Sequence, residues 1–433
     1  MARTIIGTWK RTLLAALALA GTVATADGQT LDECLEWACD NYPLTRKTDL
    51  IQQTTGLSID NIGKGWLPQV QASAQTTYQS DVAALPESLR KMMSQMGGTE
   101  YKGLSKAQYR VGVEVCQMIY DGGSTENQKQ IAQIQGAISQ SQNAVDLYAV
   151  RQRVCDLYFG VLLIDSKLSL NTNRQAVLAA NERTLGAMLK AGTASESDFS
   201  TVKAERLAAV QEATELSHQR KSLVRLLAAF TGKEVKDFSK PDLPAAGTEN
   251  KRPELTLLNH QTDLLNAEEK ALDSQLRPKV YAFAQGYYGY PGYNMFHDMM
   301  ERTPTLNGMI GVKVAWSIGA LYSRKNDKRK LALQRDMVEN QRDVFLFNNS
   351  LQQTQTRDNM SRYRALMEED DEIIRLHAAV RRAAESKLSH GIIDSNDLVA
   401  EINKESNAQL RKCIHELQMV QEAYNLKIEN GDE

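Results

Sequence analysis

The sequence lacks the features that mark several common classes of protein. Its 51 basic and 53 acidic residues nearly balance, which excludes the strongly basic composition of a nucleic-acid-binding protein. No GxSxG, P-loop or HExxH motif occurs, and the six histidines are scattered without the spacing of metal ligands. An enzyme is therefore not indicated, and we expect no cofactor and no metal site.

Long apolar runs are also missing beyond the N-terminal leader. No run after residue 26 reaches 18 apolar residues, so the sequence predicts no membrane-spanning helix. Membrane-spanning strands are not excluded by this absence. They alternate apolar and polar residues and therefore give only a weak hydropathy signal.

The leader has the pattern of a secretory signal peptide. Arg3, Lys10 and Arg11 precede an apolar stretch over 13–23, and Ala24-Thr25-Ala26 is a small-residue cleavage site. An uncleaved anchor helix is the alternative, but the apolar stretch is short for a bilayer. We therefore expect residues 1–26 to be removed, leaving a mature chain over 27–433.

Cysteine occurs in an odd number, which does not favour the disulfide framework of a secreted domain. Cys34 and Cys39 are five residues apart on a predicted helix and so point to different faces. We interpret all five as small buried apolar residues rather than as disulfides or metal ligands. They stand at positions 34, 39, 116, 155 and 413.

What the sequence does contain is an internal repeat with an offset of 199 residues. The strand-like segment Val111-Gly112-Val113-Glu114-Val115 returns as Ile310-Gly311-Val312-Lys313-Val314. Gly192 stands six residues before Asp198, and Gly391 stands six residues before Asp397. The chain is thus predicted to hold two copies of one unit, over about 31–232 and 253–430.

Each copy is expected to contain two strands followed by a long helical hairpin. The predicted strands are 69–79, 108–120, 279–290 and 307–318. The predicted helical hairpins are 124–230 and 322–428. A predicted helix precedes each strand pair, over 31–65 and 253–277. The segments 81–106 and 291–306 are predicted loops. Thr125 with Gln128 can form a capping box, and Ser195 or Ser197 can cap the return helix of the first hairpin.

The first helix of each hairpin is too long for a compact domain. Between 124 and 190 there is no proline, and Ile131, Ile134 and Ile138 begin a narrow apolar stripe with spacings of three and four. At a rise of 1.5 Å per residue such a helix would be roughly 100 Å long.

Four strands cannot close a membrane barrel, which begins at about eight strands. Open sheet edges in lipid would leave backbone groups unsatisfied. Either the strands form soluble hairpins, or several chains share one barrel, and three chains would give about twelve strands. Tyrosines near the strand ends, Tyr78, Tyr287, Tyr288 and Tyr290, fit an interfacial aromatic belt or ordinary tyrosine enrichment in strands.

Taken in order, these segments resemble the TolC family of outer membrane factors over almost the whole mature chain. The motifs that carry the resemblance are Leu31-Asp32-Glu33-Cys34-Leu35-Glu36-Trp37-Ala38, Asn41-Tyr42-Pro43, Leu67-Pro68, Ile119-Tyr120-Asp121-Gly122-Gly123, and the two glycine–aspartate pairs. The resemblance implies an α+β membrane protein, a TolC-like homotrimeric tunnel. Its 12-stranded β-barrel would lie in the outer membrane and continue into a periplasmic α-helical coiled-coil barrel.

The resemblance also implies partners and a function. A periplasmic adaptor (a membrane fusion protein) would join the channel to an inner-membrane transporter of the RND or ABC type. The chain would then passively conduct drugs, dyes and toxic compounds to the exterior. A type I protein secretion channel is the alternative, and a structural coiled-coil protein of the cell surface is a further one.

Candidate site residues follow from the matching motifs. The resemblance assigns adaptor docking to the hairpin tips, which are Lys190, Ala191, Gly192, Thr193, Ser389, His390, Gly391 and Ile392. It assigns a periplasmic constriction or gate to Asp198 and Asp397, and a strand-to-helix turn to Asp121, Gly122 and Gly123. In the plainer reading, the glycines only end helices and Asp198 only occupies a first helical turn.

Two positions depart from the family pattern, and one segment can be interpreted in two ways. Ala400 stands where a second acid is known in the family, and Ile393 replaces a basic residue. The acidic run Glu368-Glu369-Asp370-Asp371-Glu372 covers every face of its helix. It is either a solvated surface or an acidic lining of the tunnel.

Overall fold

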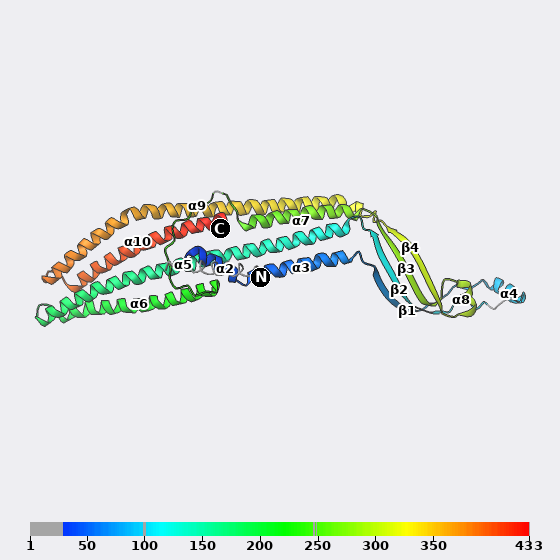
Figure 1. Cartoon of the computed structure of the whole chain (residues 1–433), viewed down its shortest axis with the longest axis horizontal. Helices are drawn as coiled ribbons and strands as arrows, with labels where there is room; N and C mark the ends of the chain where they lie inside the picture. The colour runs from blue at the N-terminus through cyan, green and yellow to red at the C-terminus, as the bar shows by residue number, and fades with distance from the viewer. Residues whose placement is uncertain (1–28, 98–100, 246, 248, 433) are drawn as a thin grey trace, which may run out of the picture. The chain divides into compact units, whose positions relative to one another are not determined.

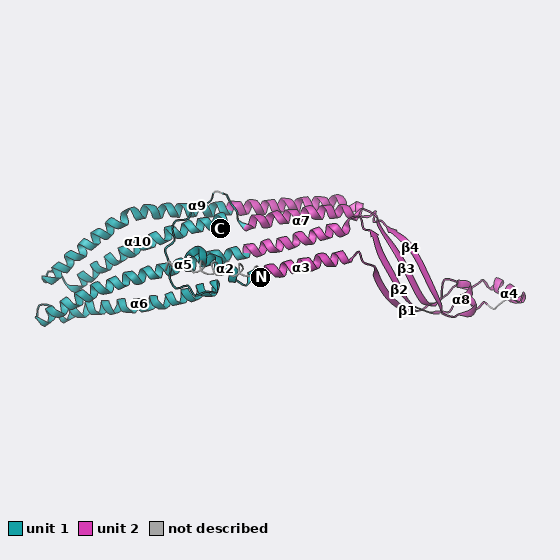
Figure 2. Ribbon diagram, viewed as in Figure 1, with its two compact units in different colours: residues 1–45, 146–252, 348–433 teal, residues 46–145, 253–347 magenta. Residues whose placement is uncertain are grey.

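The computed structural model describes residues 29–97, 101–245, 247 and 249–432. The expected signal peptide over 1–26 therefore lies outside the described residues. The chain divides into two compact units (Figure 2): unit 1 holds 1–45, 146–252 and 348–433, and unit 2 holds 46–145 and 253–347. Within the described part of the chain, no helix is both long and apolar enough to span a membrane.

Unit 2 contains a four-stranded antiparallel sheet with the order β1-β2-β3-β4. The strands are β1 (Gln69–Tyr78), β2 (Ala107–Tyr120), β3 (Lys279–Tyr290) and β4 (Thr305–Ala315). The β2–β3 pairing joins the first repeat to the second. β4 begins two residues before the predicted position and ends three residues before it, because residues 317–320 form a turn in which Ala320 donates its N–H to the Ser317 carbonyl.

The sheet has one apolar and one polar face. Directly opposed residues point to the same side of an antiparallel sheet. The register therefore places most aliphatic side chains on one side, which we call the apolar face. Its residues are Val70, Ala72, Ala74, Val111, Val113, Val115, Val280, Ala282, Ala284, Tyr288, Leu306, Ile310, Val312 and Val314. The opposite side, the polar face, carries Gln71, Gln75, Arg110, Glu114, Gln285 and Asn307, together with the apolar Phe283 and Met309.

Much of the apolar face is not covered by other parts of the chain that the structure describes. Ile310 is 84% exposed, Val70 is 68% exposed and Val111 is 62% exposed. A large exposed apolar surface indicates an apolar partner, either protein or lipid.

Helices of unit 2 pack in pairs next to the sheet. α3 (Leu44–Lys64) lies beside the first part of α5 (Ser124–Lys190), and α7 (Pro253–Gln275) lies beside the first part of α9 (Ala320–Ser389) (Figure 1). A Cβ at Gly136 of α5 would lie 2.4 Å from the Thr55 hydroxyl, so glycine permits the close approach of α3. On the other pair, Arg324 donates to Asp273 at 2.8 Å.

The predicted helix over 31–65 is two helices. α2 (Leu31–Asn41) begins with a capping box between Thr30 and Glu33 and has Tyr42 as its C-cap, directly before Pro43. Proline lacks the N–H that would continue the hydrogen-bond ladder, and the chain starts again as α3 at Leu44.

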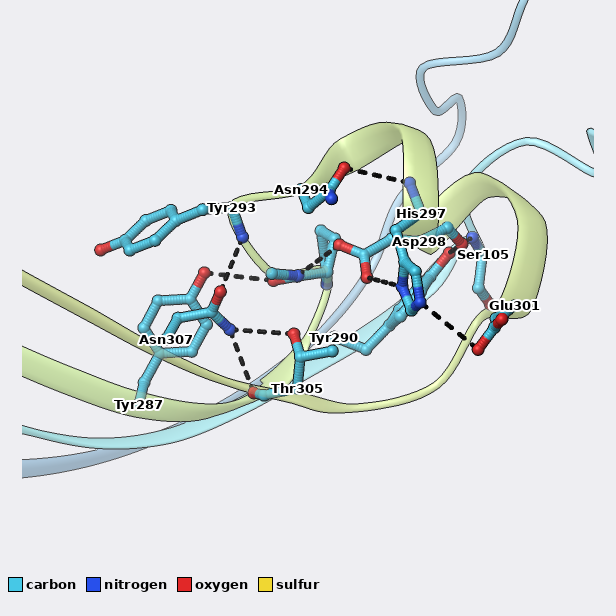
Figure 3. Close-up of polar contacts among 12 residues, drawn as sticks. Ser105, Tyr287, Tyr290, Tyr293, Asn294, His297, Asp298, Glu301, Thr305 and Asn307 are labelled. Carbon is cyan, nitrogen blue, oxygen red and sulfur yellow. Dashed lines mark hydrogen bonds and ion pairs between the residues drawn. The ribbon is translucent and has the colours of Figure 1, made fainter.

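The two predicted loops contain short helices that the sequence analysis missed, α4 (Glu87–Gln95) and α8 (Met295–Glu301). Figure 3 shows how the β3–β4 connection is held. The buried Asp298 accepts the Gly292 N–H at 2.6 Å, and Asn307 accepts the Tyr293 N–H at 2.8 Å. Polar side chains folded back on the loop thus give it a fixed shape.

Tyr290 ties this connection to the one between β1 and β2. Its hydroxyl accepts the Ser105 N–H at 3.0 Å and donates to the Asp298 carbonyl at 3.0 Å. Tyr290, the last residue of β3, is therefore buried between the two connections and is not part of an exposed aromatic belt. Tyr78 and Tyr288 remain exposed.

Unit 1 has a core around the buried Tyr158, whose hydroxyl lies 2.8 Å from the carbonyls of Gln29 and Ser239. The interpretation of all five cysteines as buried is wrong for three of them. Cys34 and Cys155 lie in this core, where burial raises the pKa of Cys34 to about 11 and of Cys155 to about 12. Residues 39, 116 and 413 are only half-buried.

The acidic run of α9 is not entirely solvated. Asp370 is buried, and its carboxylate lies 2.8 Å from Nδ1 of His415 on α10 (Ser395–Asn430). Asp371 pairs with Lys412, and Glu372 pairs with Arg375 of its own helix. Part of the run therefore joins α9 to α10.

Candidate functional site: the ends of the two helical hairpins

The two hairpin turns of unit 1 have the same hydrogen-bond pattern. At the end of α5, Thr193 donates its N–H to the Met188 carbonyl and Gly192 donates to the Leu189 carbonyl. At the end of α9, Ile392 donates to the Lys387 carbonyl and Gly391 to the Leu388 carbonyl. These bonds satisfy helix-end carbonyls, and they place the glycines in the left-handed region, with φ of 75° and 68°.

The predicted tip residues are all exposed. This holds for Lys190, Ala191, Gly192 and Thr193 in one turn and for Ser389, His390, Gly391 and Ile392 in the other. A Cβ built on Gly192 or Gly391 would meet no atom within 4 Å among the described residues. The glycines are therefore needed for their backbone conformation, and the space around them is open.

Each return helix begins with a side-chain cap at the same position of its repeat. Ser195 caps α6 (Glu196–Thr231) by accepting the Asp198 N–H at 3.1 Å, as one of the two predicted caps. Asp394 caps α10 by accepting the Asp397 N–H at 3.0 Å. The sequence analysis missed Asp394, although it lies 199 residues after Ser195.

The two candidate gate residues have different surroundings. One carboxylate oxygen of Asp198 accepts the Ser195 hydroxyl at 2.6 Å, and the other accepts the Ser395 N–H at 3.2 Å. These two hydrogen bonds, with Ser195 the larger effect, lower the pKa of the Asp198 carboxyl below its ordinary value. Asp198 thus does more than occupy a first turn, because it connects α6 to α10. Asp397 is exposed.

An apolar cluster below the turns holds the two hairpins together. It contains residues of all four helices: Leu178, Leu185, Val202, Ala209, Ala384, Leu388, Leu398, Val399 and Ile402. The hairpin ends are therefore packed against each other within one chain.

Two ion pairs at equivalent positions have opposite polarity. Glu182 of α5 accepts from Arg206 of α6 at 2.5 Å. The residues 199 positions later are Arg381 of α9 and Glu405 of α10, which also pair. Each pair links the two helices of one hairpin. The first helix carries the acid in the first repeat and the base in the second repeat. The sequence contained this signal at the repeat offset, but the sequence analysis did not test it.

The predicted strand-to-helix turn belongs to unit 2, whereas the hairpin ends belong to unit 1. The buried Asp121 carboxylate accepts the N–H groups of Gly123 at 2.8 Å and Thr125 at 2.6 Å. The expected capping box of Thr125 and Gln128 is thus wrong, because Asp121 already accepts the Thr125 N–H. Gly122 has φ of 70°, and a Cβ there would lie 2.8 Å from Cβ of Arg277, so this turn has a structural role.

The hydrogen bond from the Ser395 N–H to the Asp198 carboxylate can be tested by hydrogen exchange at the start of α10. Replacing Asp198 with Ala is expected to speed hydrogen exchange there about tenfold, the effect of losing about 1.4 kcal/mol of a charge-assisted hydrogen bond. Folding lowers the pKa of the Asp198 carboxyl. The hydrogen bond therefore stabilises the folded state fully at pH values above the pKa of the unfolded chain, and this stabilisation is lost as the pH falls through the pKa of the folded chain. The hydrogen-exchange rate of the wild-type protein at the start of α10 should therefore approach that of the variant below about pH 4.

Hydrogen exchange measured by mass spectrometry checks this, with Glu196→Ala as the matched control. Glu196 is exposed and lies in the same first turn of α6. Equal acceleration in both variants would show that the Asp198 carboxylate does not hold the start of α10.

Comparison with known proteins identifies the fold. No protein-family model matches the chain, and no curated protein matches it in sequence. Solved structures do. The outer membrane protein VceC from Vibrio cholerae is 12% identical with a TM-score of 0.63, over 93% of this chain and 97% of that one.

Two further structures agree. The open-state outer membrane channel MtrE of Neisseria gonorrhoeae is 14% identical with a TM-score of 0.64, covering 93% of this chain and 89% of that one. The outer membrane channel CmeC of Campylobacter jejuni is 11% identical with a TM-score of 0.61, covering 93% and 87%. At this identity the likeness establishes the fold, and the fold expected from the TolC resemblance is confirmed.

Proposed function

We propose that this chain, which has the fold of TolC-like outer membrane channels, is the outer membrane component of an efflux pump. It passively conducts small toxic molecules from the periplasm to the exterior and performs no chemistry. The sheet would lie in the outer membrane, and the long helices would extend into the periplasm.

The apolar face of the sheet is the observation that carries this proposal. Strands of a membrane barrel alternate between an apolar side toward lipid and a polar side toward the lumen. Here the strands place their valines and most of their alanines on one side, where Val70, Val111 and Ile310 are exposed, and most of their charged and amide side chains on the other. A soluble sheet would bury such a face.

The sheet edges support a trimer. Within the described residues, β1 and β4 each pair with only one neighbour, and lipid does not tolerate an open edge. Pairing β4 of one copy with β1 of the next would close a barrel of three chains. α9 adds an exposed stripe at intervals of seven residues, Met337, Val344 and Leu351, which fits a coiled-coil contact with another copy.

The hairpin tips are proposed to bind a periplasmic adaptor that is joined to an inner-membrane transporter. The support is that two similar turns, all exposed, stand at the ends of the paired hairpins. In-cell crosslinking from photoreactive residues at Lys190 and Ser389, with Gln352 in the middle of α9 as a control, tests this. An adaptor captured only at the tips is expected, and equal capture at Gln352 would contradict docking.

The tip glycines give a sharper form of that test. Gly192→Val with Gly391→Val forces a β-branched residue into the left-handed region at about 1–2 kcal/mol per turn. We expect the crosslinking yield to fall about tenfold, since 1.4 kcal/mol is a factor of ten. Gly56→Val is the matched control: Gly56 is exposed in α3, where valine meets no neighbour. A yield that stays equal to the control would show that the turn conformation is not recognised.

The type of cargo separates the remaining alternatives. Deleting the gene should raise the sensitivity of cells to dyes and drugs if the chain serves efflux. Loss of a secreted protein with unchanged sensitivity would instead indicate a type I secretion channel. Unchanged transport with altered adhesion would indicate a structural surface protein. The paired strands favour a channel over the last alternative.

Asp198 and Asp397 are proposed to line the narrow periplasmic end. Carboxylates repeated around a threefold axis would favour cations over anions. The support is their common position, in the first turn of the return helix of each hairpin.

A further inference from the structure

Two aromatic side chains of β3 lie on the polar face of the sheet. Phe283 and Tyr287 share the side of Gln285, and the apolar face of the same strand carries the small Ala282 and Ala284. The interior of a membrane barrel is polar, and apolar side chains normally face the lipid. Two rings on the polar face therefore indicate a role other than contact with lipid.

The first repeat has no rings at the equivalent positions. Phe283 and Tyr287 stand five and nine residues after the proline that precedes β3, and the same positions of β1 hold Ser73 and Thr77. The two rings are therefore particular to β3 and are not a requirement of the repeated unit.

Glycines on the neighbouring strands make room for these rings. Gly311 of β4 opposes Phe283, and a Cβ there would lie 2.8 Å from Cζ of the phenylalanine ring. Gly112 of β2 opposes Tyr287, and a Cβ there would lie 2.7 Å from Cβ of the tyrosine. Because a side chain at either glycine would collide with its aromatic neighbour, both rings have their place on the polar face.

A hollow of about 380 Å³ lies next to the second ring. Its lining includes Gln75 of β1, Arg110 of β2, Tyr287 of β3 and Met295 of α8. All four belong to unit 2 of one chain, so the hollow needs no second copy. Its volume falls within the range of roughly 300–1,000 Å³ that is typical of small-molecule sites.

The Tyr287 ring is held in place from the β3–β4 connection. The ring of Tyr293 meets it edge to face, with 5.5 Å between the ring centroids (Figure 3). The Tyr287 hydroxyl donates to the Pro291 carbonyl at 3.3 Å. A ring fixed in this way can stack with a flat ligand without losing much conformational freedom.

Arg110 supplies the polar group of the hollow. Its Nε and Nη2 donate to the side-chain oxygen of Gln75 at 3.1 and 2.8 Å, which orients the guanidinium. A guanidinium has five N–H donors, and the remaining ones have no hydrogen-bond partner among the residues that the structure describes. They are available to an oxygen acceptor of a ligand.

We propose that this hollow binds planar aromatic molecules that carry a carboxylate or carbonyl oxygen. The inference rests on the proposed function, because it takes the polar face as the wall of the lumen, and it names the class of cargo. The aromatic part of the ligand stacks on Tyr287, and its oxygen accepts hydrogen bonds from Arg110. Phe283 offers the next ring along β3. Such a site must bind weakly enough to release what it conducts.

Binding of naphthoate, a planar aromatic carboxylate, tests the proposal. The protein is purified in mild detergent, its oligomeric state is measured by native mass spectrometry, and its affinity for naphthoate is measured by saturation-transfer NMR. Replacing Tyr287 with Leu, or Arg110 with Gln, should weaken binding about tenfold. Tyr287→Phe is the matched control, because it keeps the ring and should bind as the wild-type protein does. The fully saturated analogue of naphthoate, which is not planar, should bind the wild-type protein about tenfold more weakly.

Four outcomes would overturn the proposal. A trimer from the outer membrane that does not bind naphthoate overturns the site and leaves the proposed function standing. Binding that Tyr287→Leu and Arg110→Gln leave unchanged does the same, because the ligand would then lie elsewhere. Equal binding of the saturated analogue overturns the role of the ring. A soluble monomer that binds naphthoate overturns the proposed function, and with it the assignment of the ligand as cargo.

Discussion

Arginine in place of Ile310 is expected to reduce the amount of this protein in the outer membrane at least tenfold. Ile310 lies near the middle of β4 on the apolar face and is 84% exposed. On a lipid-facing strand, arginine near the bilayer midplane costs about 2–4 kcal/mol, and three copies would share one barrel. Immunoblotting of the outer membrane fraction measures the effect.

Met309→Arg is the matched control, one residue earlier in the same strand. Met309 opposes Gln285 on the polar face, so its arginine would extend into the water-filled lumen. Its level should stay close to that of wild type. If both variants reached the outer membrane equally, the apolar face would not face lipid.

Replacing Arg381 with Glu is expected to destabilise the hairpin ends by about 2–3 kcal/mol. This loss is smaller than the loss on breaking a fully buried ion pair, because the site is partly exposed. Arg381 pairs with Glu405 and, at 2.6 Å, with Glu385. Burial opposes its charge, but the hydrogen bond that Arg381 donates to Glu405 and the nearby carboxylates outweigh burial and raise the pKa of Arg381. Arg381→Glu would place three carboxylates together, and the apparent Tm of the purified protein should fall by about 5 °C.

The first repeat shows how to rescue this variant. Adding Glu405→Arg to Arg381→Glu recreates the polarity that Glu182 and Arg206 have in the equivalent place. Most of the lost stability should return, except for about 0.5 kcal/mol of repulsion between the introduced glutamate and Glu385, one helical turn later. A double variant as unstable as the single one would show that the ion pair itself contributes little.

The repeat made most of the fold predictable from the sequence. Strands and long helices have strong periodic patterns, and the copy at an offset of 199 gave each pattern a second instance. The break at Pro43 was not predicted, although proline supplied the signal. The short helix α8 escaped because polar contacts such as the Asp298–Gly292 bond fix it, and these contacts join residues that no periodicity relates.

The candidate site was predictable only in part. Local turn chemistry identified Gly192 and Gly391, since a helix end needs the left-handed conformation. The different surroundings of Asp198 and Asp397 were not predictable, because they depend on how the two hairpins pack. The burial of Asp370 against His415 has the same cause.

The mass of the protein in its native state tests the central claim most directly. The chain should be extracted from the outer membrane fraction in mild detergent, and native mass spectrometry should give three times the mass of the mature chain. A protein recovered as a monomer from the soluble periplasmic fraction would contradict the account. The apolar face would then need an apolar partner other than the membrane.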